Sequence, residues 1–157
     1  MERTLDEWMT FIAQRQKHSL PRLLALLRKD MEQKFTEKML ARGYNDFKMG
    51  HIVLLVNIDP DGTINNELAR LAKITKQGMN KVVKILESAG YIYTEPHQTD
   101  KRAILLKLTD KGKQKRLDLY HCHVEIRKEY EEVVGQDDID HMLRTLRKLL
   151  GYHEDQI

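Results

Sequence analysis

Two short helices with a tight corner between them, followed by a two-stranded hairpin, are predicted in the middle of the chain, and this order constrains the fold more than any other feature. The helices are expected over residues 66–72 and 76–89, where apolar residues recur at helical spacing. Residues 91–94 and 103–108 are rich in strand-forming side chains. The sequence therefore predicts a winged helix-turn-helix.

The helix expected over 76–89 has one apolar and one polar face. Thr75 is a good N-cap, and Gly90 follows the helix. The apolar face must meet the core and consists of Met79, Val82, Val83 and Leu86. The opposite face carries Lys76, Gln77, Asn80, Lys81 and Lys84. A polar outer face occurs on any surface helix, so its meaning depends on the corner and hairpin beside it.

Such a helix fits the major groove of DNA, where every base pair presents its own pattern of donors and acceptors. Asn and Gln can pair with adenine through two hydrogen bonds, and Lys can reach guanine or phosphate. Lys101 and Arg102 fall at the hairpin turn, where a cation suits the negative potential of a narrow minor groove. We therefore predict DNA binding by the polar face together with Lys101 and Arg102.

The charge distribution supports a polyanionic partner for the middle of the chain. The net charge is +3, but residues 76–116 hold ten Lys and Arg and four acidic residues, a surplus of six. The rest of the chain carries a deficit of three. A basic middle between acidic flanks is typical of nucleic-acid binding; a solvated charged surface is the alternative interpretation.

The flanking segments predict long helices with more apolar surface than a small lobe can bury. One stripe, within a helix expected over 21–41, consists of Leu20, Leu23, Leu24, Leu27 and Met31. A helix capped by Thr109 runs to about Val134, and a last helix carries apolar residues over 139–150. Burying both end stripes between two copies gives a two-fold homodimer whose recognition helices reach half-sites about one DNA turn apart on a palindrome. Packing within one chain is the alternative.

The expected architecture is mainly α with a small β-wing, a winged helix-turn-helix flanked by N- and C-terminal dimerisation helices. The predicted divisions are 1–44 and 110–157 for dimerisation and 45–109 for DNA binding. Residues 59–62 form a strong turn, and Thr63-Ile64 could be a very short strand. Helix caps are expected at Asn45 or Asp46, and at Asn65 or Asn66.

Residues 66–112 resemble the multiple antibiotic resistance regulator (MarR) family. The stretch 67–72 looks like the first helix-turn-helix element of that family, 75–84 like its recognition helix, and 86–92 like its passage to the wing. The most specific match is Asp100-Lys101-Arg102 followed by Leu108-Thr109-Asp110-Lys111-Gly112, against the family pattern Asp-x-Arg, a strand and Leu-Thr-x-x-Gly. The flanking helices fit in order and length, although Gly78 departs from the usual helix formers.

The resemblance implies an obligate dimer and repression that a small molecule relieves. It implies that Arg102 enters the minor groove and that Asp100 stabilises the wing by ionic pairing. A small aromatic or lipophilic effector is expected between the dimer helices and the DNA-binding lobe. Its pocket could be lined by Phe35, Tyr44, Phe47, His51 and Tyr120, each of which could instead be an ordinary core residue.

The sequence gives less support to a redox-active thiol or a metal site. Cys122, the only cysteine, shares a helical face with Leu119, Ile126 and Val133, so a buried and inert thiol is favoured over a redox sensor. No two of the seven histidines have the i, i+4 spacing of a helical chelate, and no metal site or cofactor is expected.

Three further interpretations concern the class of protein. No phosphate loop, metalloprotease motif or nucleophile elbow is present, so an enzyme is not expected. A winged-helix module that binds protein instead of DNA is the remaining alternative. No apolar run is long enough to span a membrane and no signal peptide is seen, so no membrane partner and a cytoplasmic location are expected.

Overall fold

The computed structural model describes residues 4–45, 48–97 and 103–151. Within these ranges the chain is mostly helical, with one small sheet, which confirms the predicted fold class. The elements in chain order are α1 (Leu5–Gln16), α2 (Leu20–Ala41), α3 (Met49–Asn57), β1 (Thr63–Ile64), α4 (Asn65–Leu71), α5 (Lys76–Ser88), β2 (Ile92–Pro96), β3 (Ile104–Leu108), α6 (Asp110–Val134) and α7 (Gln136–Leu149).

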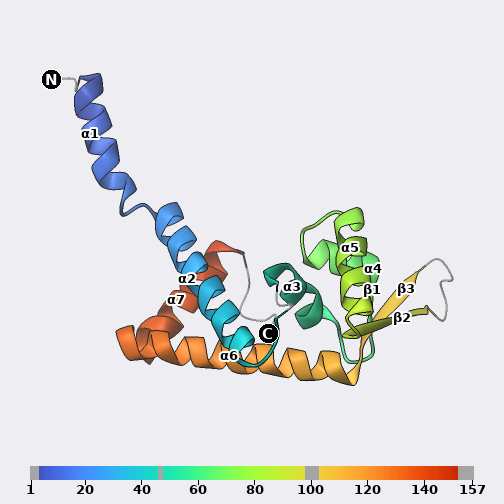
Figure 1. The fold of residues 1–157 in the computed structure, drawn as a ribbon. Coiled ribbons are helices and arrows are strands. Elements are labelled where there is room, and N and C mark those ends of the chain that lie inside the picture. The colour runs from blue at the N-terminus through green and yellow to red at the C-terminus, as the bar shows by residue number, and fades with distance from the viewer. Residues whose placement is uncertain (1–3, 46–47, 98–102, 152–157) are drawn as a thin grey trace.

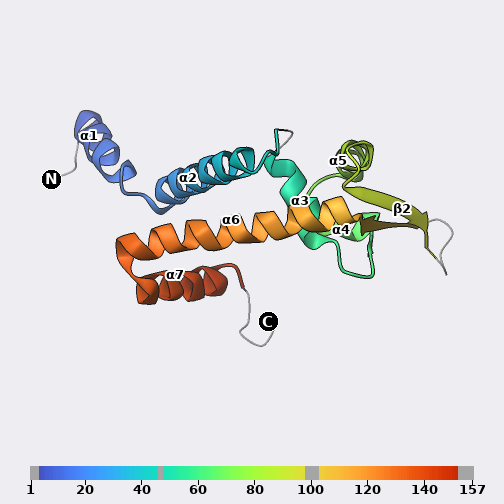
Figure 2. The same cartoon turned by 60° about the horizontal axis from the view of Figure 1, so that its bottom comes forward.

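The molecule is elongated, with a lobe at one end of the long helix α6 (Figure 1). The lobe contains α3, α4, α5 and the three-stranded antiparallel sheet, whose strand order is β1-β3-β2. Along the rest of α6, helices α2 and α7 lie on opposite sides, so the three form stacked layers (Figure 2). Helix α1 projects away from this body (Figure 1), and none of its residues is buried.

The structure confirms two of the predicted caps and corrects two others. The hydroxyl groups of Thr75 and Thr109 accept hydrogen bonds from the first turns of α5 and α6. The N-cap of α3, however, is Lys48 and not Asn45, while Asp46 lies outside the described residues. The N-cap of α4 is Ile64, and Asn65 is already the first helical residue.

The lobe and α6 meet at a junction that the residues Leu108-Thr109-Asp110-Lys111-Gly112 create. The Thr109 N–H donates to the carbonyl oxygen of Tyr91 over 3.1 Å, and its hydroxyl donates to the carbonyl of Gly90 over 2.6 Å. A Cβ on Gly112 would lie only 1.9 Å from the same Tyr91 oxygen. Glycine is therefore required here because the backbone of α6 rests directly on the backbone of Tyr91, just after the end of α5.

A buried lysine continues this junction one turn further along α6. Lys115 is fully buried, with 0% of its surface exposed. Its Nζ lies 3.9 Å from the ring centroid of Tyr91 and 5.0 Å from that of Tyr44. Tyr44 in turn donates a hydrogen bond from its hydroxyl to Asp118 over 2.5 Å. A desolvated ammonium between two aromatic faces joins α6 to the lobe and to the end of α2.

Ion pairs hold α2 against α6 along the side away from the lobe. Lys34 and Lys38 each place Nζ 2.8 Å from a carboxylate oxygen of Glu129. Lys38 also lies 3.3 Å from Glu125, which Arg42 contacts as well. The hydrogen bonds from Lys34 and Lys38 lower the pKa of Glu129 from 4.5 to about 2. This seam fixes the register of the two helices.

Replacing Lys115 with Ala should destabilise the protein by about 2–5 kcal/mol, because it removes a large buried side chain and its packing against two aromatic rings. Urea unfolding at fixed protein concentration measures the change. The matched control is Lys113→Ala, since Lys113 is exposed on the same helix and pairs only with exposed Asp110 among the described residues. Equal midpoints for the two variants would contradict a structural role for Lys115.

The pairing of Glu129 should make stability depend on pH in the acid range. A carboxylate whose folded pKa is depressed contributes stability above its unfolded pKa, here about 4.5, and the contribution disappears as pH falls toward about 2. Thermal unfolding measured across this range should show a falling midpoint, and Glu129→Gln should make the fall smaller. Glu132→Gln, a change at an exposed position on the same helix, should leave it as steep as in the wild type.

Candidate nucleic-acid interface

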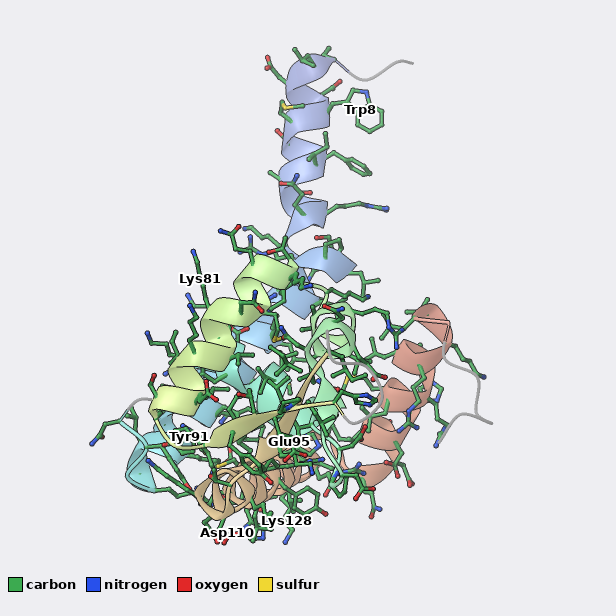
Figure 3. The ribbon with its side chains drawn as sticks, turned by 90° about the vertical axis from the view of Figure 1, so that its right-hand side faces the viewer. Trp8, Lys81, Tyr91, Glu95, Asp110 and Lys128 are labelled. Carbon is green, nitrogen blue, oxygen red and sulfur yellow. The ribbon has the colours of Figure 1, made fainter. Side chains whose placement is uncertain are left out.

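Helix α5 turns the predicted polar face toward solvent. Met79 and Leu86 are buried, and Val82 and Val83 pack partly buried against the core. The five predicted DNA-binding residues of this helix are all exposed: Lys76, Gln77, Asn80, Lys81 and Lys84. Lys81 points away from the body of the molecule (Figure 3). The apolar stripe therefore sets the direction of the polar face, as its spacing predicts.

The cations of α5 are not neutralised by neighbouring acids. Across 4–45, 48–97 and 103–151, no carboxylate forms an ion pair with Lys76, Lys81 or Lys84. On the adjoining sheet, by contrast, Lys107 pairs with Glu95 over 2.6 Å. Three unpaired ammonium groups on one helix face are available to phosphate oxygens.

The wing is an antiparallel hairpin of β2 and β3. Its register pairs Ile92 with Leu108 and Pro96 with Ile104. Beyond the strands, the N–H of His97 donates to the carbonyl of Ala103 over 3.1 Å. The predicted wing residues Asp100, Lys101 and Arg102 belong to the connection after His97 and lie outside the described residues. Their roles remain predictions.

The corner between α4 and α5 uses a conformation that the sequence does not signal. Lys73 has a positive φ of 52°, which is the left-handed region that glycine usually occupies after a helix. The N–H of Ile74 then donates to the carbonyl of Ala69 over 3.1 Å and closes the helix end. Lys73 therefore helps to form the corner that joins α4 to α5.

Asn65 is a second residue whose role sequence analysis missed. Its Nδ2 donates to Oδ1 of Asn80 over 2.6 Å and so links the start of α4 to the exposed face of α5. A polar pocket of about 120 Å³ lies beside this bond. It is lined by Ile64, Asn65, Asn66, Lys76, Asn80, Ala103 and Ile104. The spacing of fifteen residues between the two asparagines follows no helical period, so only the fold brings them together.

The structure brings two of the five predicted effector residues into one cavity. Phe35 and Tyr120 line a space of about 320 Å³ between α2, α3 and α6, together with Ile52, Val56, Arg116, Leu119 and His123. Tyr44 instead packs at the Lys115 junction, and His51 is buried in α3. Neither lines this cavity, and Phe47 lies outside the described residues.

The remaining candidate chemistries map to the core or to scattered positions. Cys122 is fully buried, its Sγ lies 3.6 Å from Sδ of Met39, and burial raises the pKa of its thiol. This environment fits an inert thiol. Among the described residues, no three His, Cys, Asp or Glu side chains gather in a way that could hold a metal ion.

Solved structures with the same fold come from several sources. One is a MarR transcriptional regulator from Methanosarcina mazei Go1, with 17% identity and a TM-score of 0.73 over 84% of this chain and 94% of that one. Another is wild-type MarR in its apo form from E. coli, with 19% identity and a TM-score of 0.68 over 84% and 96%. A third is MepR from S. aureus bound to ethidium bromide, with 19% identity and a TM-score of 0.56 over 85% and 95%.

The sequence itself matches the family model described as the MarR family over residues 51–103, from α3 to the end of the wing connection. The middle of the chain is therefore similar to the MarR family, as the sequence predicts. The match and the shared fold confirm the predicted resemblance. Members of this family are transcriptional regulators and not enzymes, in agreement with the expectation for this chain. Among curated proteins, none is significantly similar in sequence to this chain.

In the part of the chain that the structure describes, no helix has the length and apolar character needed to cross a membrane.

Proposed function

We propose that this protein is a regulator of the MarR family, a sequence-specific transcriptional repressor that binds a palindromic operator as a homodimer. The observation that carries the proposal is the exposed face of α5, with three cations that no described carboxylate pairs and two amides, Gln77 and Asn80. Cations give affinity through phosphates, and amides give sequence preference through base edges. Lys101 and Arg102 would extend the interface into the minor groove, with Asp100 stabilising the wing.

The dimer is proposed because the ends of the chain expose apolar side chains that a single copy leaves uncovered. On α1, Leu5 is 75% exposed, Trp8 44% and Met9 52%. At the end of α7, Leu149 is 67% exposed and Leu150 71%. Apolar surface of this extent marks an interface in a regulator of this architecture. We therefore assign dimerisation to residues 1–44 and 110–157, and DNA binding to residues 45–109.

A small aromatic or lipophilic effector is proposed for the cavity of Phe35 and Tyr120. The cavity lies where α2 and α6 meet α3, which is the border between the proposed dimer region and the lobe. Its lining is mostly apolar, with Arg116 and His123 as polar groups, as is usual for small-molecule sites. MepR, a structural relative, binds ethidium, an aromatic compound. A ligand here would release DNA by changing the position of the lobe. We place the protein in the cytoplasm, with the DNA.

Lys81→Ala should weaken DNA binding and reduce its salt dependence. Fluorescence anisotropy against DNA from the region upstream of its own gene, over a salt series, should give a shallower salt slope, by about 0.9 for each phosphate that the variant no longer neutralises. Lys128→Ala is the matched control, because Lys128 lies on α6 away from α5 (Figure 3). An equal effect of both variants would contradict the assignment of α5. Absence of binding even at low salt would favour the protein-interaction alternative.

Ile12→Asp should dissociate the dimer, since Ile12 lies one or two turns from Leu5, Trp8 and Met9 on the same side of α1. Sedimentation should then give a monomer, and operator affinity should fall because one recognition helix binds alone. Gln14→Asp places the same charge on the opposite side of α1 and should stay dimeric. A dimer that survives Ile12→Asp unchanged would exclude this face from the interface.

A further inference from the structure

The hydrogen bond between Asn65 and Asn80 determines which half of the Asn80 amide faces solvent. Asn80 is exposed on α5, whereas Asn65 is partly buried at the start of α4. The bond joins Asn65 Nδ2 to Asn80 Oδ1 over 2.6 Å. The acceptor atom of Asn80 is therefore held against α4. Its Nδ2, the donor atom, has no hydrogen-bond partner among the described residues.

The reverse orientation of the two amides is less favourable. As the structure stands, Asn65 Oδ1 is buried without a hydrogen-bond partner among the described residues. Turning both amides would keep a bond between the side chains but would bury the Asn65 NH₂ group there instead. Unpaired buried N–H groups are rarer in proteins than under-satisfied carbonyl oxygens. The packing of Asn65 therefore selects the donor-outward state of Asn80.

We propose that Asn65 is a specificity-determining positioning residue that makes Asn80 a hydrogen-bond donor toward DNA. The proposal rests on the proposed DNA binding by α5. An unrestrained asparagine pairs with adenine by accepting from N6 and donating to N7. With Oδ1 held by Asn65, the amide plane cannot align both atoms with adenine. Asn80 then prefers bases that present acceptors in the major groove, namely guanine through N7 and O6, thymine through O4 or adenine through N7 alone, and it disfavours cytosine, which presents only a donor.

Gln77 provides the contrast on the same helix face. It is exposed, and its side chain forms no hydrogen bond with any described residue. Its amide is free to turn and can read a base with either atom. The exposed face of α5 therefore carries one fixed amide, that of Asn80, and one that can turn, that of Gln77. Only the Asn80 amide depends on a residue outside α5.

Asn65→Asp tests this assignment, because a carboxylate accepts and does not donate. Asn80 must then turn and donate Nδ2 to Asp, so that Oδ1 faces the groove and prefers the amino groups of adenine or cytosine. The matched control is Asn66→Asp, which adds the same charge at the next, exposed position. Asn65→Ala releases the Asn80 amide without adding charge, and it serves if the Asp variant fails to fold. Thermal unfolding of each variant checks folding.

The measurement is selection from a randomised DNA duplex pool by full-length protein, followed by sequencing. Asn80→Ala identifies the base pair in each half-site that Asn80 reads. At that pair the wild type should disfavour cytosine, which presents only a donor. Asn65→Asp should raise cytosine relative to guanine and thymine by about fivefold or more, and Asn65→Ala, which leaves the Asn80 amide unrestrained, should favour adenine. Asn66→Asp should lower affinity and keep the wild-type preference.

Three outcomes would overturn the proposal. One is an Asn65→Asp profile identical to that of Asn66→Asp. A second is an Asn80→Ala profile identical to that of the wild type, since Asn80 would then read no base. In both cases the wild type still selects a sequence, so the proposed function stands. A wild type that selects no sequence would overturn the proposed function and this inference together.

Discussion

The contact between Gly112 and the carbonyl oxygen of Tyr91 determines how the two parts of the molecule are joined. Gly112 lies in the first turn of α6, and Tyr91 lies three residues after the end of α5, so the long helix rests on the end of the helix that is proposed to face DNA. Thr109 bonds the same carbonyl, and Lys115 covers the Tyr91 ring. Through these contacts α6 is packed directly against the end of the α5 segment, so a change in the direction of α6 is expected to move α5.

The proposed effector cavity and this junction share the helix α6. Tyr120 lies on α6 about one turn beyond Lys115, and Phe35 reaches the cavity from α2, which ion pairs hold against α6. A ligand between these helices would act on the same rigid helix that carries Gly112. In the proposed dimer, a short displacement of α6 would change the spacing of the two α5 helices without a long relay of side chains.

The features that sequence analysis predicted are those that local patterns determine. The stripe of Met79, Val82, Val83 and Leu86 defined α5 and its exposed face, and the Thr75 and Thr109 hydroxyls defined two helix starts. Asn65 or Asn66 was expected to cap α4, but the N-cap is Ile64 and the Asn65 amide bonds Asn80, because the fold brings the α5 face beside it. Burial of Lys115 and the positive φ of Lys73 arise likewise from packing, which a single sequence does not display. Of the predicted effector residues that the structure describes, only Phe35 and Tyr120 line the same cavity, because the relative directions of the helices cannot be derived from a single sequence.

The cations between α2 and α6 differ from those on α5 in whether carboxylates pair with them. Between α2 and α6, Lys34, Lys38 and Arg42 are all matched to carboxylates, and their charge holds two helices in register. On α5, no described carboxylate pairs with Lys76, Lys81 or Lys84, although acidic side chains are frequent elsewhere. Unpaired cations gathered on one face repel one another and add nothing to folding. A polyanion that neutralises these cations makes their arrangement favourable. The exposed face of α5 therefore suits a polyanionic partner, whereas the ion pairs between α2 and α6 stabilise the fold.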